Sequence, residues 1–339
     1  MAEKFQKLGG IQIARAVAAL SVCYFHSWTI LDRFPQETSY PIPGVAKYGW
    51  LGVDLFFGIS GFVICLVVTR PTFRPTQFAI RRVFRLYPLW ILTLSLFALM
   101  AWCWRGLLPT ETIGNFLYSA TLLPTQGFPF YDIGWSLQHE MAFYLIAIIV
   151  VPVARVTGLI IFLCISTVVN QLVSLPWYFS QLASYHPEFL VGVVAFLLTH
   201  RLRWTGSIVP IALGTGFIIS ILASDGPRWL FPAPLFFFIV GFANLTQSRF
   251  TSWIVPLGDS SYSIYLIHPL VFAVAKSLTK LYGSNIIWIE EPLRFSAIGI
   301  VIMLSLLSWR FFEKPMIEAA ESVAKLNNSH DVVAKDRRL

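Results

Sequence analysis

Long, nearly uninterrupted runs of apolar residues limit the possible folds of this chain more than any other feature. Of its 339 residues, 56% are hydrophobic and only 12% are charged, too few charges to keep the surface of a soluble domain of this size wet. Segments of about 20 apolar residues cross a bilayer core. We therefore expect an all-α polytopic transmembrane helix bundle of about ten spans, placed near residues 11–31, 49–69, 87–104, 135–154, 156–175, 187–200, 207–223, 229–247, 252–275 and 293–312.

The remaining segments are short and polar by comparison. Residues 1–315 are expected to form one transmembrane domain, and residues 316–339 a polar cytoplasmic tail that is partly disordered. The apolar stretch 113–123 is too short to span, so we expect it to be interfacial or re-entrant. We expect the first apolar segment to be an uncleaved helix and no extracytoplasmic domain to be fused to the chain.

The net charge of +8 is explained by the positions of the basic residues. If the N-terminus is cytoplasmic, 18 of the 25 Lys and Arg residues fall on the cytoplasmic side of the ten segments. This asymmetry follows the positive-inside rule and favours cytoplasmic N- and C-termini. It accounts for the basic excess without a nucleic-acid partner. The four cysteines each lie inside an apolar run, so we expect neither a disulfide nor a metal site.

Three titratable residues fall within predicted spans at a similar depth in the outer half of the bundle. They are His26, Asp54 and Glu140. Ionisable side chains inside a bilayer are costly and usually functional, and an imidazole beside a carboxylate is what a general base and its orienting partner require. Purely structural roles are the alternatives: His26 could form a hydrogen bond to another helix, Asp54 could form an ion pair with Arg33 or Lys47, and Glu140 could be hydrated at the membrane interface.

An arginine cluster precedes the third span. Arg81, Arg82 and Arg85 share one side of a helix at i, i+1 and i+4, and guanidinium groups bind phosphate oxygens bidentately. Arg15 is expected near the same cytoplasmic entrance. The cluster predicts an anionic cytoplasmic ligand. Two other roles would explain the arginines equally well: setting the orientation of the spans in the membrane, or contacting anionic lipid headgroups.

These pieces resemble the acyltransferase-3 family of integral membrane acyltransferases over nearly the whole chain. Six elements in order carry the resemblance: Arg15 with His26, the sequence GVDLFFGISGF at 52–62, RRVFRLYP at 81–88, WSLQHE at 135–140 followed by Phe143-Tyr144, SYSIYLIHP at 261–269, and Glu313-Lys314-Pro315. One departure is the Gln138-His139 pair, where such proteins often carry smaller residues before the Glu. This departure implies an acceptor site of altered shape.

The resemblance implies transfer of an acyl group, usually acetyl, from cytoplasmic acyl-CoA to a hydroxyl of an extracytoplasmic or lipid-linked glycan. It also implies a place in a membrane, which we expect to be the bacterial cytoplasmic (inner) membrane. Catalysis would then involve His26, as general base or acyl relay, with Asp54 and Glu140, and no metal. The expected acyl-CoA-binding residues are Arg15, Arg81, Arg82 and Arg85, and the expected substrate-binding residues are Ser60, Trp135, Ser136, Tyr265 and His268.

The main alternative is a secondary transporter in which His26, Asp54 and Glu140 form a proton relay. The lack of an internal repeat and the position of the arginines in a loop speak against it. A structural scaffold ranks third, because it has no need for titratable groups at depth.

Overall fold

The computed structural model describes residues 9–31, 42–105, 110–202, 206–224, 226–245, 251–282 and 287–324. Within these ranges the chain is built from helices, turns and short connections, with no strand. The all-α prediction is confirmed for this part of the chain. The helices are α1 Gly9–Ser27, α2 Pro43–Tyr48, α3 Leu51–Val68, α4 Pro75–Arg105, α5 Thr110–Ala120, α6 Trp135–Leu172, α7 Trp177–Ala183, α8 His186–Leu202, α9 Ile208–Ala223, α10 Pro232–Ala243, α11 Val255–Asp259, α12 Ser261–Tyr282 and α13 Ile287–Ser308.

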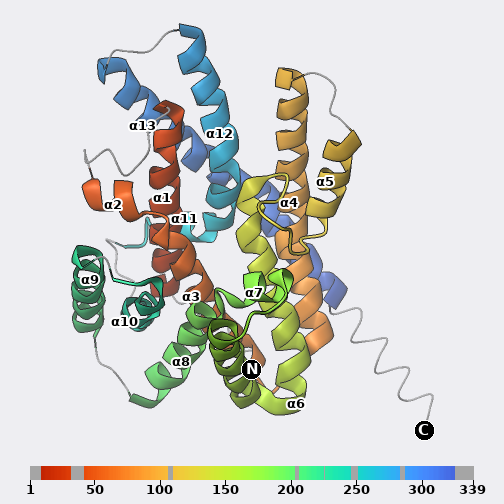
Figure 1. The fold of residues 1–339 in the computed structure, drawn as a ribbon, viewed down its shortest axis with the longest axis vertical. Helices are drawn as coiled ribbons and strands as arrows, with labels where there is room; N and C mark the ends of the chain where they lie inside the picture. The colour runs from red at the N-terminus through yellow and green to blue at the C-terminus, as the bar shows by residue number, and fades with distance from the viewer. Residues whose placement is uncertain are drawn as a thin grey trace.

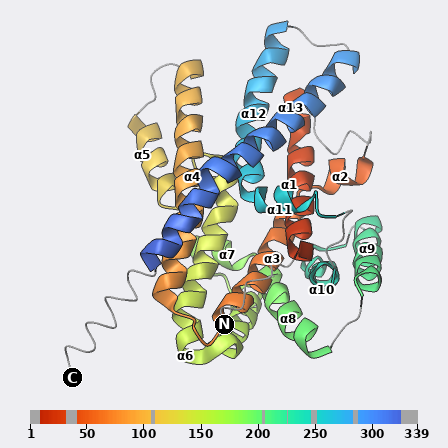
Figure 2. The ribbon, with the colours of Figure 1, turned by 180° about the vertical axis from the view of Figure 1, so that it is seen from behind.

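Helices α1 and α3 occupy the middle of the bundle, with α4 and α5 on one side and α9 and α10 on the other (Figure 1). Seen from behind, α13 runs obliquely across the molecule from α12 toward the lower part of α4 (Figure 2). It continues into a π-helix, Trp309–Glu313, and the helical backbone extends to Ala324. Residues 316–324 of the predicted tail are therefore helical, and residues 325–339 lie outside the described residues.

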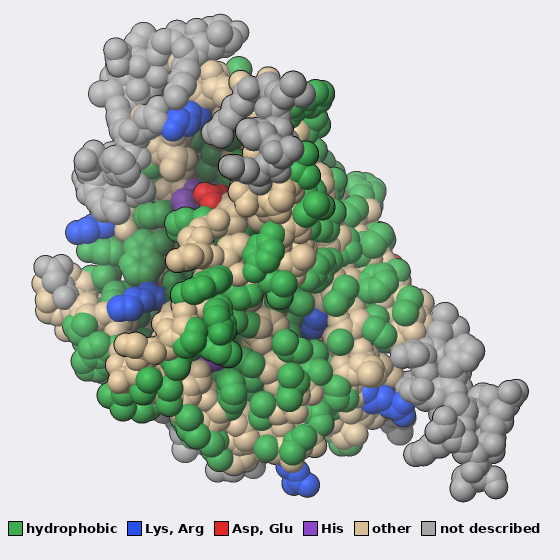
Figure 3. Space-filling model, turned by 45° about the vertical axis from the view of Figure 1, so that its right-hand side comes forward, with side chains coloured by type: hydrophobic (Ala, Val, Ile, Leu, Met, Phe, Trp, Pro, Cys, Tyr) green, Lys and Arg blue, Asp and Glu red, His purple; other side chains and the backbone are tan. Residues whose placement is uncertain are grey.

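The predicted spans coincide with helices throughout the described part of the chain. Six helical stretches there are long and apolar enough to cross a membrane, whereas the helices at 208–223 and 228–243 are shorter. The two segments predicted at 135–154 and 156–175 form the two halves of α6, which are separated by non-helical backbone at Arg155. Figure 3 shows a broad face covered mainly by hydrophobic side chains, as expected for a surface in lipid. An integral membrane protein is therefore confirmed, and the count of ten spans stays a prediction.

The stretch predicted to be interfacial or re-entrant at 113–123 belongs largely to the eleven-residue helix α5. Its Ile113, Leu117 and Tyr118 side chains are exposed. A helix of eleven residues rises about 16 Å, roughly half of a bilayer core. The structure thus agrees with a segment that does not span on its own.

Helices α3 and α8 pack closely because glycines line their contact. A Cβ added at Gly192 of α8 would lie 1.9 Å from the carbonyl oxygen of Gly58 in α3, and one added at Gly61 would lie 2.2 Å from the carbonyl oxygen of Phe189. Membrane helices associate through such small residues because lipid supplies no hydrophobic driving force between them. This contact fixes the position of α3, which carries two of the predicted site residues.

Substitution of Gly192 by alanine should therefore destabilise the bundle by about 3 kcal/mol or more, since backbone atoms must move to admit the methyl group. The matched control is Gly216→Ala in α9, where a Cβ meets nothing within 4 Å. Thermal unfolding of the detergent-purified proteins measures the difference. Equal midpoints for the two variants would show that the α3–α8 contact is looser than described.

Candidate active site

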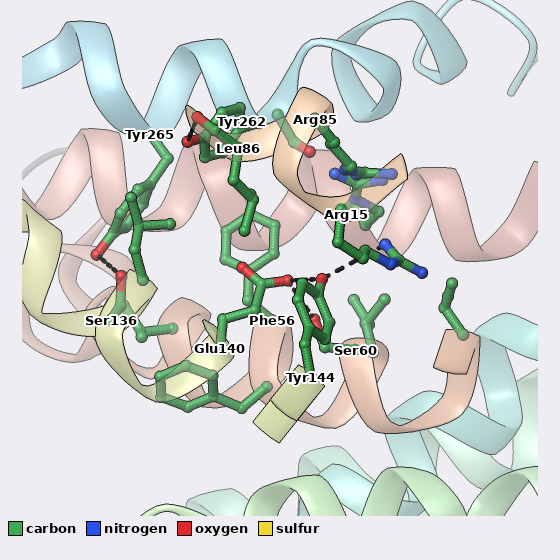
Figure 4. A pocket seen from close by; sticks show the side chains of 17 residues that line it. Arg15, Phe56, Ser60, Arg85, Leu86, Ser136, Glu140, Tyr144, Tyr262 and Tyr265 are labelled. Carbon is green, nitrogen blue, oxygen red and sulfur yellow. Dashed lines mark hydrogen bonds between the residues drawn. The ribbon is translucent and has the colours of Figure 1, made fainter. Parts of the chain in front are cut away.

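A cavity open at its mouth lies among helices α1, α3, α4, α6 and α12; the empty space there, open solvent included, is about 730 Å³. Its two ends differ in chemistry: in Figure 4, Arg15 and Arg85 lie toward one end, Ser136 and Tyr265 lie at the other, and Glu140 and Tyr144 lie between them. The cavity thus gathers side chains from segments that are up to 250 residues apart. Its lining consists of Arg15, Val53, Phe56, Phe57, Ile59, Ser60, Val63, Arg82, Arg85, Leu86, Ser136, Leu137, Glu140, Tyr144, Ser261, Tyr262 and Tyr265.

Three arginines line the basic end of the cavity: Arg15, Arg82 and Arg85. Arg82 and Arg85 are three residues apart on α4 and so share a face. The Arg82 guanidinium lies 4.8 Å from the centre of the Tyr144 ring, and its Nη1 donates a long hydrogen bond of 3.4 Å to the Tyr144 hydroxyl. Among the described residues, none of these three arginines forms a salt bridge. Their positive charge is therefore available to an anionic ligand.

Arg81 occupies a different position from its two neighbours. It is exposed and lines a second, solvent-open cavity at the turn between α3 and α4, together with Arg70 and Arg74. Successive residues of an α-helix are rotated by about 100° around its axis. Arg81 therefore faces a different direction from Arg82, and it does not line the first cavity. Three of the four residues predicted to bind acyl-CoA thus share one cavity, and Arg81 does not.

Glu140 occupies the middle of the first cavity. Its Oε1 accepts hydrogen bonds from the Ser60 hydroxyl at 3.1 Å and from the Tyr144 hydroxyl one helical turn along α6. Ser60 comes from α3, so this carboxylate links two of the cavity walls. The prediction placed Glu140 beside His26, whereas its hydrogen-bond partners in the described chain are Ser60 and Tyr144.

Tyr265 and Ser136 line the far end of the cavity. The two hydroxyls are 2.7 Å apart, and the Tyr265 hydroxyl lies 3.2 Å from the Ile133 carbonyl oxygen. Trp135, predicted to bind substrate, lies outside this lining and packs against the rings of Phe57 and His139.

His26 is hydrogen-bonded to His268, which lies next to Tyr265 at this end of the cavity. The distance from His26 Nδ1 to His268 Nε2 is 2.9 Å, and the two rings are parallel within 10°. The Tyr265 ring meets the His268 ring edge-on with centroids 6.0 Å apart, so Tyr265 joins the cavity lining to the histidine pair. His26 is half-buried and His268 is fully buried. His268, predicted to bind substrate, contacts His26.

Asp54 belongs to a separate network at the start of α3. The Arg228 guanidinium donates to both Asp54 carboxylate oxygens, at 2.6 and 2.7 Å, and Arg228 Nη2 lies 3.3 Å from Glu188 Oε1 in α8. Asp54 and Glu188 are only 2% and 3% exposed. The partner of Asp54 is thus Arg228. The sequence analysis considered Arg33 and Lys47 as its partner, and Arg33 lies outside the described residues.

The three titratable residues predicted to converge therefore have three different sets of partners. His26 bonds to His268, Glu140 to Ser60 and Tyr144, and Asp54 to Arg228. A single proton relay through all three has no continuous hydrogen-bonded path in the described chain. In the part of the chain that the structure describes, no group of three or more His, Cys, Asp or Glu side chains is placed to hold a metal ion.

Two residues of the Asp54 network, the buried Glu188 and the more exposed Arg228, escaped the sequence analysis. Glu188 interrupts an apolar segment, and the cost of burying a carboxylate in a membrane was a signal that could have singled it out. Arg228 was counted among the outer basic residues that set topology, and nothing in the sequence pairs it with Asp54, 174 residues away.

A family profile described as an acyltransferase domain matches residues 8–309, which include every residue of this cavity and the histidine pair. The chain belongs to the acyltransferase-3 family. It is accordingly an acyl-transferring enzyme of the membrane, and the arginine-lined cavity lies within its acyltransferase domain.

Curated relatives of this acyltransferase are similar over most of their length. The exopolysaccharide production protein ExoZ of Rhizobium meliloti (strain 1021) is 25% identical over 79% of this chain and 90% of its own. The putative membrane-bound transacylase BcsY of Komagataeibacter xylinus is 25% identical over 80% of this chain and 77% of its own. The putative acetyltransferase ORF330 of Acidianus two-tailed virus is 25% identical over 83% of this chain and 88% of its own. No solved structure matches the chain.

Proposed function

We propose that this acyltransferase transfers an acyl group, namely acetyl, from cytoplasmic acyl-CoA to a hydroxyl of an extracytoplasmic or lipid-linked glycan. The observation that carries the proposal is the cavity with Arg15, Arg82 and Arg85 at one end and hydroxyl and carboxylate groups further in. Removing arginine side chains from water costs free energy unless an anion binds them and compensates their charge. The phosphates of coenzyme A supply such an anion.

The direction of transfer follows from the two ends of the cavity. With both termini cytoplasmic, as the positive-inside rule favours, the arginine end opens to the cytoplasm and the Tyr265 end points outward. The phosphates would be held by the arginines, and the thin arm of the donor would extend toward Tyr265 and Ser136. His26, beyond Tyr265, would meet an acceptor that arrives from the outer side.

His26 would act as general base on the acceptor hydroxyl, or accept the acyl group and pass it on. Glu140 would orient Ser60 and Tyr144 along the donor cavity. Asp54 would hold the outer end of α3 through Arg228, a role that keeps Phe56 and Phe57 in the cavity wall. The glycan class is supported by the similarity to ExoZ, an exopolysaccharide production protein.

The test is a thioester assay on the detergent-purified enzyme with acetyl-CoA or succinyl-CoA and a panel of neutral and acidic oligosaccharides. We expect free coenzyme A to be released only when an acceptor is present, and the acyl group to be recovered on that acceptor as an alkali-labile ester. Saturable acetyl-CoA binding by the protein alone is expected as well. Folded protein that binds neither thioester would contradict the proposal.

A further inference from the structure

The hydrogen bond between His26 and His268 fixes which ring nitrogens carry protons, and this has a chemical consequence. His26 contributes Nδ1 and His268 contributes Nε2, so exactly one of these two nitrogens must be the donor when both rings are neutral. Which one donates depends on whether Nδ1 of His268 carries a proton, and the backbone atoms around Nδ1 determine this.

The Nδ1 atom of His268 lies 3.0 Å from the carbonyl oxygen of Ile264, one turn earlier in α12. A carbonyl oxygen can only accept, so this nitrogen carries the proton. Pro269, the next residue, has no N–H and leaves the Tyr265 carbonyl without its usual helical donor. The Ile264 carbonyl thus favours His268 with a proton on Nδ1.

The surroundings of His268 keep it neutral and hold its ring in place. The residue is fully buried, and its ring packs edge-on against Tyr265 and Phe272 at centroid distances of 6.0 and 5.6 Å. In the described chain no carboxylate contacts it, so a second proton on His268 would create an unpaired buried charge. A neutral ring protonated on Nδ1 presents a lone pair at Nε2, directed at His26.

We propose that His268 is a positioning residue that selects the reactive tautomer of His26. Because His268 Nε2 accepts, His26 Nδ1 must donate, and the remaining lone pair of His26 therefore lies on Nε2. In the part of the chain that the structure describes, this nitrogen has no protein partner, and His26 is half-buried. The hydrogen-bonded chain runs from the Ile264 carbonyl through His268 and His26 to the acyl acceptor. In a catalytic triad a buried carboxylate accepts a hydrogen bond from the catalytic imidazole and orients it; here the imidazole of His268 takes that place.

This inference rests on the proposed function for its chemistry. In the direct reaction, His26 Nε2 takes the proton of the acceptor hydroxyl while the hydroxyl oxygen bonds to the thioester carbon. The carbon–sulfur bond then breaks, and the proton on His26 passes to the leaving sulfur, which restores the neutral imidazole. His268 keeps its Nδ1 proton throughout and stabilises the transient imidazolium through the same hydrogen bond.

Nitrogen NMR of the full chain in detergent, labelled with ¹⁵N-histidine, tests the tautomer without any need for turnover. The His26 signals are assigned by their loss in His26→Ala. We expect a protonated Nδ1 and an unprotonated Nε2 in the wild-type protein. A protonated Nε2 with an unprotonated Nδ1 would overturn the inference, whatever the activity of the enzyme.

Two replacements of His268 provide the kinetic test. In His268→Gln an amide oxygen can reach the position of Nε2 and accept from His26, whereas in His268→Asn the shorter side chain can serve Ile264 but not His26. We expect kcat to fall about 100-fold in His268→Asn and less than about 10-fold in His268→Gln, with KM for acetyl-CoA changed less than twofold in both. Equal kcat values in the two folded variants would contradict the role of His268.

The outcomes also separate this inference from the proposed function. If His26→Ala transfers acyl groups at the wild-type rate, the proposed chemistry of His26 fails while the NMR result for the tautomer stands. If His26→Ala is inactive but His26 carries its proton on Nε2, the proposed function survives and the role of His268 fails.

Discussion

His26→Ala is expected to reduce acyl transfer by at least about 1000-fold, the upper part of the range for loss of a general base. The half-buried position of His26 at the end of α1 and its single hydrogen bond to His268 make a small replacement compatible with the fold. Transfer to a glycan acceptor, measured with labelled acetyl-CoA, gives the rate. The thermal midpoint of the same preparation establishes that the variant is folded.

The matched control for this variant is His186→Asn. His186 is also buried and bonds through Nδ1 to the Ser166 hydroxyl at 2.7 Å, far from the histidine pair, and asparagine can keep that bond. We expect its transfer rate to stay within threefold of the wild type. A folded His26→Ala protein that retains a tenth or more of the wild-type rate would remove His26 from the chemistry.

Replacing Arg82 and Arg85 together by alanine should weaken acetyl-CoA binding about 100-fold or more. Each charge-assisted hydrogen bond to a phosphate contributes about 1.5–3 kcal/mol, and two are removed. Both residues line the cavity, and among the described residues neither forms a salt bridge that its loss would break. Equilibrium binding to the detergent-purified protein measures the effect.

Arg81→Ala is the control because it removes the same charge from the same helix outside this cavity. We expect less than a threefold change in affinity. The comparison also separates a specific site from general attraction by the basic surface. If Arg81→Ala weakens binding as much as the double variant does, the arginines act through summed charge or topology and the cavity is not the donor site.

Sequence patterns were sufficient to predict the helices but not their partners. The length of a membrane span is set by the bilayer, so apolar runs locate α3, α8 and both halves of α6 closely. The rotation of each helix about its axis has no such signal. Helix α3 is apolar on nearly all sides, and a helix without an apolar stripe does not show from its sequence which face meets which neighbour.

The same reasoning explains which site residues lie together. Spacing along one helix predicts that Arg82 and Arg85 share a face, and both line the cavity. Depth in the bilayer placed His26 and Asp54 at comparable levels, but depth alone cannot choose among neighbours at that level. The observed partners are distant in sequence: 242 residues separate His26 from His268, and 174 separate Asp54 from Arg228.

The Asp54–Arg228–Glu188 network also constrains the biosynthesis of the protein. The two buried carboxylates belong to α3 and α8, whereas their common cation follows α9 and is synthesised later than either. Until Arg228 leaves the ribosome, the α3–α8 pair contains acidic groups without this counter-ion, and chains are built from the N-terminus onward. Capture of Arg228 is therefore a late step in assembly, one that joins the third quarter of the polypeptide to helices already inserted.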